Sequence, residues 1–154
     1  MKPLHHLIFS SIMALIWYLI TFNPLTTLVF WLSAIFIDLD HLLDYFIFYP
    51  KEIFKPLFFL RERLSYFMSS KYYKKKTYVI LHSLELVIAL FIIAILLKNQ
   101  ILLAISLGFL FHLFLDFIGN IYIKGSVKNL PFYFLSYRIA NKFEVKKLLN
   151  RDKF

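Results

Sequence analysis

Three short stretches of this sequence combine carboxylates with imidazoles inside otherwise apolar surroundings. They are DLDHLLD (38–44), LHSLE (81–85) and FHLFLD (111–116). Carboxylate and imidazole without sulfur suit zinc, manganese or iron. Because several buried carboxylates repel one another unless a cation or protons neutralise them, a divalent ion would stabilise such a group. The residue types therefore predict a metal site, with zinc the first expectation and manganese or iron the alternatives.

The elements that must position these residues are predicted to be membrane helices. The chain has 154 residues, of which 60% are hydrophobic and 20% aromatic, too apolar for a soluble domain. Four apolar blocks, at about residues 3–22, 25–48, 78–97 and 101–119, are each long enough to cross a hydrocarbon core of about 30 Å. We expect an all-α, polytopic integral membrane protein with four transmembrane helices, forming a single membrane domain over residues 1–154. The first block lacks a small-residue cleavage pattern, so a retained helix is expected there.

The basic residues predict the orientation of these helices. They gather in a loop at 49–77 and a tail at 120–154, whereas the turns at 23–24 and 98–100 carry one cation between them. By the positive-inside rule, the loop, the tail and both termini are cytoplasmic, in the cell (inner, cytoplasmic) membrane. This distribution, despite a net charge of +9, disfavours a nucleic-acid partner. Segments 53–67 and 130–139 are expected to lie in the interface, the first as an amphipathic segment. Cysteine is absent, which excludes thiolate ligands and disulfides.

Helical geometry brings the polar residues to one depth. Asp38 lies about 20 Å and Asp116 about 22 Å from the predicted outer ends of their helices, with His112 near 16 Å. The remaining histidines and an acidic residue enter the first and third helices from the same cytoplasmic side: His5, His6, His82 and Glu85. His112 and Asp116 share a face through i,i+4 spacing. Since intramembrane ionisable groups face a bundle interior or a wet cavity, we expect one cluster.

These three stretches also carry a family resemblance. In order and spacing, the chain resembles the membrane-bound metal-dependent hydrolases, polytopic proteins with a DxDH motif, a later His-Ser pair and a HxxxD motif near the last helix. Thr77 departs from the pattern, because many members have a histidine there as part of a fuller motif. The resemblance implies as ligands Asp38, Asp40, His41, His82, His112 and Asp116, with His5 or His6 as a further candidate.

A metal bound there would most commonly serve to lower the pKa of a water for attack on a carbonyl or phosphorus centre. Glu85, one turn from His82, is the first candidate for a catalytic general base, and Asp44 is the second. An anionic headgroup could be held by basic residues of the loop and tail, namely Arg61, Arg63, Arg138 and the lysines at 74–76. We therefore expect a metal-dependent hydrolase that acts on a phospholipid or lipid-linked phosphoester from the cytoplasmic leaflet.

Three alternatives stay open at this point. The polar residues could be interhelical hydrogen-bonding groups without a metal. The chain could be a small transporter or ion pathway, although every proline lies at a helix boundary and Gly108 is the one glycine well inside a span. It could also be a non-enzymatic adaptor with a structural metal, which binds a soluble protein through its basic loop. Membrane lipids are the expected partners, and a homo-oligomer is left open.

Overall fold

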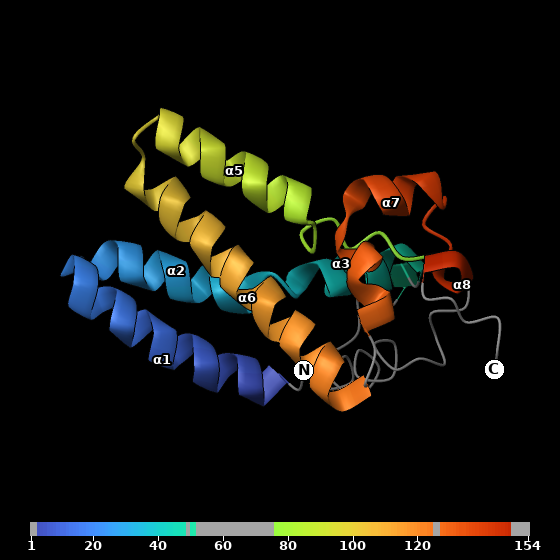
Figure 1. Ribbon diagram of the computed structural model, residues 1–154, viewed down its shortest axis with the longest axis horizontal. Coiled ribbons are helices and arrows are strands. Elements are labelled where there is room, and N and C mark those ends of the chain that lie inside the picture. The colour runs from blue at the N-terminus through green and yellow to red at the C-terminus, as the bar shows by residue number, and fades with distance from the viewer. Residues whose placement is uncertain (1–2, 49, 52–75, 125–126, 149–154) are drawn as a thin grey trace.

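The fold is all-helical, as predicted. The computed structural model describes residues 3–48, 50–51, 76–124 and 127–148, and within these ranges it has no strand, only an isolated bridge between Lys76 and Glu144. Figure 1 shows the α-helices α1 (Pro3–Thr21), α2 (Pro24–Phe36), α3 (Leu39–Phe48), α5 (Leu84–Leu96), α6 (Gln100–Lys124), α7 (Leu135–Ala140) and α8 (Val145–Leu148), together with the 3-10 helix η2 (Val127–Tyr133).

Two asparagine caps form the tight turns that the sequence predicts. The Oδ1 atoms of Asn23 and Asn99 each accept hydrogen bonds of 3.0–3.1 Å from the backbone N–H groups two and three residues later. These bonds satisfy donors that a helix leaves free at its start. Phe22 and Lys98, the residues just before the two caps, adopt left-handed backbone angles that reverse the chain. The results are the hairpins α1–α2 and α5–α6 (Figure 1).

The second predicted helix is interrupted. We expected a continuous helix over 25–48, but α2 ends at Phe36 and α3 begins at Leu39. Ile37 and Asp38 form a turn in which the backbone N–H of His41 bonds to the carbonyl of Asp38 at 3.1 Å. The sequence has no proline or glycine at this position, and its apolar residues continue across it, so the sequence pattern did not predict the break. The interruption places Asp38 on a turn between two helices.

The third predicted helix begins six residues late. We expected it to start at residue 78, whereas α5 starts at Leu84 and residues 76–83 are extended or turning. Ser83 is the N-cap, with its hydroxyl accepting from the Leu86 N–H at 3.3 Å. His82 therefore lies on a non-helical segment. At 13 residues, α5 is about 20 Å long, which is shorter than a bilayer core.

Close packing of α2 against α6 depends on Gly108. A Cβ atom at this position would meet the Phe30 carbonyl oxygen at 2.6 Å and the Ser33 Cβ at 2.8 Å. Only glycine lets the two backbones come this near, which is how small residues act at membrane helix interfaces. Ala104, one turn earlier on α6, is fully buried against Phe30 and Ala14.

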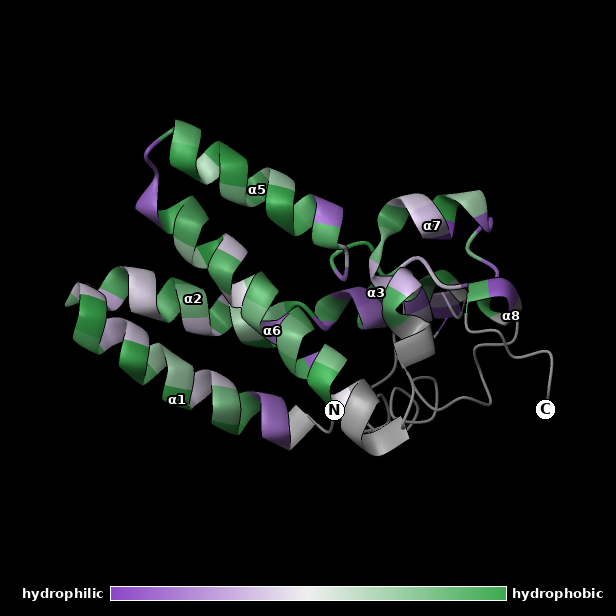
Figure 2. Ribbon diagram, viewed as in Figure 1, coloured by the Kyte–Doolittle hydropathy of each residue, from purple (hydrophilic) through white to green (hydrophobic). Residues whose placement is uncertain are grey.

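The outer faces of the long helices are apolar. Figure 2 shows hydrophobic residues along α1, α2, α5 and α6, and exposed examples include Ile20, Leu96 and Phe114. Among the described residues, two segments are long and apolar enough to cross a membrane, Pro24–Ile47 and Gln100–Gly119, with only 28% and 33% of their most apolar windows buried. The helix of a soluble core would be mostly buried. His5–Thr21 and Leu84–Leu96 are apolar but shorter, so the structure supports two candidate spans and not the four expected.

The C-terminal region is helical, and α6 is longer than expected. The expected interfacial segment 130–139 forms the end of η2 and most of α7, and α6 continues to Lys124, five residues past the expected end at 119. The amphipathic segment 53–67, with most of the basic loop, lies outside the described residues. In Figure 1, α3, α7 and α8 gather at one end of the molecule, beyond the helices of the apolar hairpins.

Candidate metal centre

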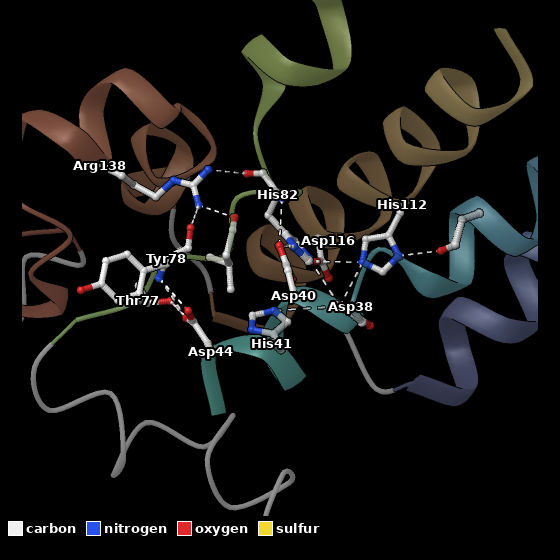
Figure 3. Close-up of polar contacts among 12 residues, drawn as sticks. Asp38, Asp40, His41, Asp44, Thr77, Tyr78, His82, His112, Asp116 and Arg138 are labelled. Atoms are coloured by element: carbon white, nitrogen blue, oxygen red, sulfur yellow. Dashed lines mark hydrogen bonds and ion pairs between the residues drawn. The ribbon is translucent and has the colours of Figure 1, made fainter. Parts of the chain in front are cut away.

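Four side-chain atoms from three parts of the chain lie close together, and Asp38, His82 and His112 among them form a group that could hold a metal ion. Asp38 comes from the turn between α2 and α3, His82 from the non-helical segment, and His112 and Asp116 from α6 (Figure 3). The Nε2 atoms of His82 and His112 each lie 3.4 Å from Asp38 Oδ1 and 3.6 Å from Asp116 Oδ2. We call Asp38, His82, His112 and Asp116 the central cluster.

The spacing of these atoms suits a small divalent ion. Nitrogen and oxygen ligands at about 2.0–2.1 Å from a tetrahedral zinc lie about 3.3–3.4 Å from one another. The four nitrogen–oxygen separations in the central cluster, 3.4 and 3.6 Å, are close to that value. The same residue types also suit manganese or iron. The donor set therefore fits a metal, and its identity is left open.

Hydrogen bonds behind the two histidines direct their lone pairs into the cluster. His112 Nδ1 lies 2.7 Å from the carbonyl oxygen of Ala34, which can only accept, so Nδ1 carries the proton. His82 Nδ1 lies 3.0 Å from Asp40 Oδ2. A neutral ring that is protonated at Nδ1 has its lone pair on Nε2. Both Nε2 atoms are buried and have no hydrogen-bond partner among the described residues. A histidine held in this way is the usual metal ligand of proteins.

Asp40 supports His82 from behind. Its Oδ2 accepts from the ring Nδ1–H and also lies 3.3 Å from the backbone N–H of His82. We expected Asp40 to be a ligand in its own right. It belongs to a group with His41 and His82 that could hold an ion. Its contacts with His82 also suit a position one step behind the ligand, where a carboxylate fixes the tautomer and raises the basicity of the imidazole.

His41 and His6 lie at the edges of the central cluster. His41 Nε2 is 3.9 Å from Asp38 Oδ1, and its ring centre is 4.8 Å from that of His82. His6 Nε2 is 3.1 Å from Asp116 Oδ1, and its ring stacks on His112 at 4.2 Å. The side chains of His6, Asp40 and His41 complete two further groups that could hold an ion, one with His112 and Asp116 and the other with His82. His5 is exposed and takes part in neither, which separates the two N-terminal candidates.

Asp44 does not lie where a general base is needed. Its carboxylate accepts a 2.8 Å bond from the Thr77 hydroxyl and bonds of 2.9 and 3.0 Å from the Tyr78 N–H. At 1% exposure it is neither solvated nor part of the central cluster. Asp44 instead anchors the start of the segment that carries His82. The catalytic role expected for it is therefore withdrawn.

The contacts of Glu85 also argue against a role as general base. Its two oxygens accept bonds from the backbone N–H groups of Leu135 and Ser136 and from the hydroxyls of Ser136 and Ser83, at 2.6–3.0 Å. These donors belong to the first residues of α7 and to the cap of α5. A carboxylate held by four donors binds protons weakly. Glu85 connects α5 to α7, and we withdraw the general-base assignment.

Arg138 is buried and does not face an exposed headgroup. It is 0% exposed, and its guanidinium donates to the carbonyls of Tyr78, Val79 and His82 (Figure 3). Burial lowers its pKa, an effect that the nearby carboxylates oppose. Arg61 and Arg63, the other headgroup candidates, lie outside the described residues, as do the lysines at 74 and 75.

The central cluster is closed on one side and open on the other. His82 and His112 are essentially buried, whereas the Asp38 side chain is 32% exposed and that of Asp116 is 17% exposed. The carboxylates of Asp38 and Asp116 are therefore the part of the cluster that solvent reaches. The sequence did not indicate that the Ala34 carbonyl bonds His112. It could have indicated the close packing at Gly108, because this glycine lies four residues before His112 on the same helix.

Comparison with known proteins adds no relative. No family model, no curated protein and no solved structure matches the chain. The resemblance to metal-dependent hydrolases thus rests on the motifs alone.

Proposed function

We propose that this protein is a membrane-embedded, metal-dependent hydrolase that acts on a phospholipid or other lipid-linked phosphoester. The observation that carries the proposal is the pair of buried Nε2 atoms, aimed at two carboxylates and fixed in orientation by Asp40 and the Ala34 carbonyl. Without a metal, both nitrogens would need a proton to pair with the carboxylates of Asp38 and Asp116, which lie 3.4–3.6 Å away, longer than a good hydrogen bond. A divalent ion would bind both nitrogens and neutralise the carboxylates.

In this proposal, the side chains of the protein bind the ion and accept protons from the reacting groups. Asp38, His82, His112 and Asp116 would hold the ion, with His6 beside Asp116. When bound, such an ion lowers the pKa of a coordinated water and polarises a phosphoryl oxygen. Asp38 and His41 are the proton-accepting groups nearest to the open side, since Asp44 and Glu85 are held by other contacts. The buried histidines exclude water from the opposite side.

The apolar surface supports a lipid substrate. Asp38 of the central cluster directly precedes α3. Figure 2 shows hydrophilic residues at α3, next to the largely hydrophobic helices α2 and α6. A phosphoester anchored in a bilayer would arrive at that level. We propose four membrane-crossing elements with cytoplasmic termini in the inner membrane, in which residues 77–83 complete the short α5. Thr77, Val79, His82 and Ser83 of this segment are buried. Non-helical backbone at membrane depth is tolerated where it is buried in protein.

An ion pathway is the second candidate, and the structure gives it more support than the sequence did. We argued against it from the absence of proline or glycine breaks inside the spans. The helix nevertheless breaks at Ile37 and Asp38, and His82 lies on a non-helical segment. Broken helices at polar residues are typical of transporter sites.

Metal analysis with a lipid turnover assay tests the proposal. Protein purified in detergent should hold at least one divalent ion per chain and release a labelled headgroup from mixed membrane lipids. His112→Ala should lose both properties, whereas His5→Ala, which alters an exposed histidine, should keep them. If the protein binds metal but turns over no lipid class, a purely structural metal site is the remaining interpretation. Movement of metal ions across proteoliposomes would favour the ion pathway. A folded wild type without metal would refute all three.

A further inference from the structure

Residues 76–83 form a segment that cannot hold itself in place. The segment is extended or turning, so few of its carbonyls are satisfied by helical bonds. It nevertheless carries His82, whose Nε2 must point at the central cluster. Buried backbone carbonyls need donors from elsewhere. The donors come from the C-terminal region, about sixty residues further along the chain.

Arg138 supplies most of these donors. One guanidinium nitrogen donates to the Tyr78 and Val79 carbonyls, and the other donates to the carbonyl of His82 at 3.2 Å. The planar fork of an arginine can reach several acceptors at fixed angles, which a lysine cannot do. The guanidinium also lies 5.4 Å from the centre of the Phe132 ring.

Burying a guanidinium completely is costly unless opposite charge lies near. Three carboxylates, Asp40, Asp44 and Glu85, act favourably on Arg138 through space. Two of them hold the same segment: Asp40 bonds His82, and Asp44 bonds Tyr78. Glu85 holds the first residues of α7, the helix on which Arg138 lies. One buried cation thus interacts with the carboxylates that hold the His82 segment and with the one that holds α7.

We propose that Arg138 is a positioning residue for the metal centre, because it fixes the backbone of His82 at its own carbonyl. This inference rests on the proposed metal site. The Asp40 contact sets the rotation of the imidazole ring, whereas Arg138 sets the backbone from which the side chain projects. Without Arg138, the carbonyls of Tyr78, Val79 and His82 each lose a donor and the segment can relax, which moves Nε2 away from Asp38 and Asp116.

Cobalt(II) titration of the purified full-length chain tests this inference. Arg138→Met keeps an unbranched apolar stem and removes the guanidinium donors. It should bind Co²⁺ about 10- to 100-fold more weakly than wild type, as is typical when the residues that support metal ligands are lost. The visible absorption band of bound Co²⁺ should also change in position or intensity, because the ligand geometry changes. Lys147→Met is the matched control: it removes an exposed cation from the same region and should bind as wild type does.

A merely structural role for Arg138 gives a different result. The metal-free variant would then unfold at a lower temperature, but its folded form would bind Co²⁺ with wild-type affinity and spectrum, which overturns the inference. If Arg138→Met does not fold, Arg138→Lys decides. Its single ammonium cannot bond all three carbonyls, so weaker binding supports the inference and wild-type binding overturns it. Failure of wild type to bind Co²⁺ refutes the metal site itself.

Discussion

His112 and His82 present the same atom to the same point, yet they are held in opposite ways. His112 lies on an unbroken helix, four residues from Asp116, and needs one bond to the Ala34 carbonyl. His82 lies on a non-helical segment that is held by Asp40, Asp44 and Arg138, side chains from two distant regions. On a helix, the regular spacing of residues is enough to position a metal ligand. A ligand on a non-helical segment must be positioned by other side chains.

Removing either histidine should have the largest effect. His82→Ala and His112→Ala should each weaken divalent-metal binding by at least about 100-fold, more than the loss of a supporting residue costs. Each removes one donor atom from a set of four. The measurement is metal affinity by competition with a fluorescent chelator. A full loss in one variant and none in the other would show that the two histidines do not share an ion.

Asp40→Asn should have an intermediate effect and should separate support from ligation. The amide oxygen can still accept from His82, but the charge that raises the basicity of the imidazole is gone. We expect about 10- to 100-fold weaker binding with the metal content at saturation unchanged. Loss of one equivalent of metal at saturation would mean that Asp40 is a ligand after all.

Glu85→Gln should have the smallest effect on the metal. Because Glu85 holds α7 through hydrogen bonds, the expected change is faster amide hydrogen exchange in residues 135–140, by about tenfold or more. Metal affinity and any lipid turnover should stay within about threefold of wild type. A general base at this position would instead lower turnover by about 10² to 10⁴ with the metal unchanged.

The contrast between the two histidines also explains what could be predicted from the sequence. Apolar block lengths and the asparagine turns predicted the helical fold, and i,i+4 spacing predicted that His112 and Asp116 share a face. Both are local properties. The break at Ile37 and the late start of α5 could not be predicted, because they depend on contacts between Asp40, Asp44 or Arg138 and residues 34 to 56 positions away.

The misassigned residues have the same cause. Glu85, Asp44 and Arg138 were assigned to catalysis or substrate binding because an ionisable group in an apolar segment is expensive. Each is instead compensated by backbone groups that a regular helix would have satisfied. A sequence in which helices are interrupted needs such residues, and their charge alone does not distinguish them from functional ones.

The contact at Gly108 has a consequence for which ions the site could admit. Backbone touches backbone there, one turn from His112, so α2 and α6 cannot move closer, and any separation exposes a gap. Asp38 follows α2, and Asp116 lies on α6, so their spacing is tied to this contact. Calcium, with oxygen ligands at about 2.3–2.6 Å and a need for six to eight of them, would have to force the helices apart. The absence of a side chain at Gly108 would therefore restrict the size of the cation that the site could hold.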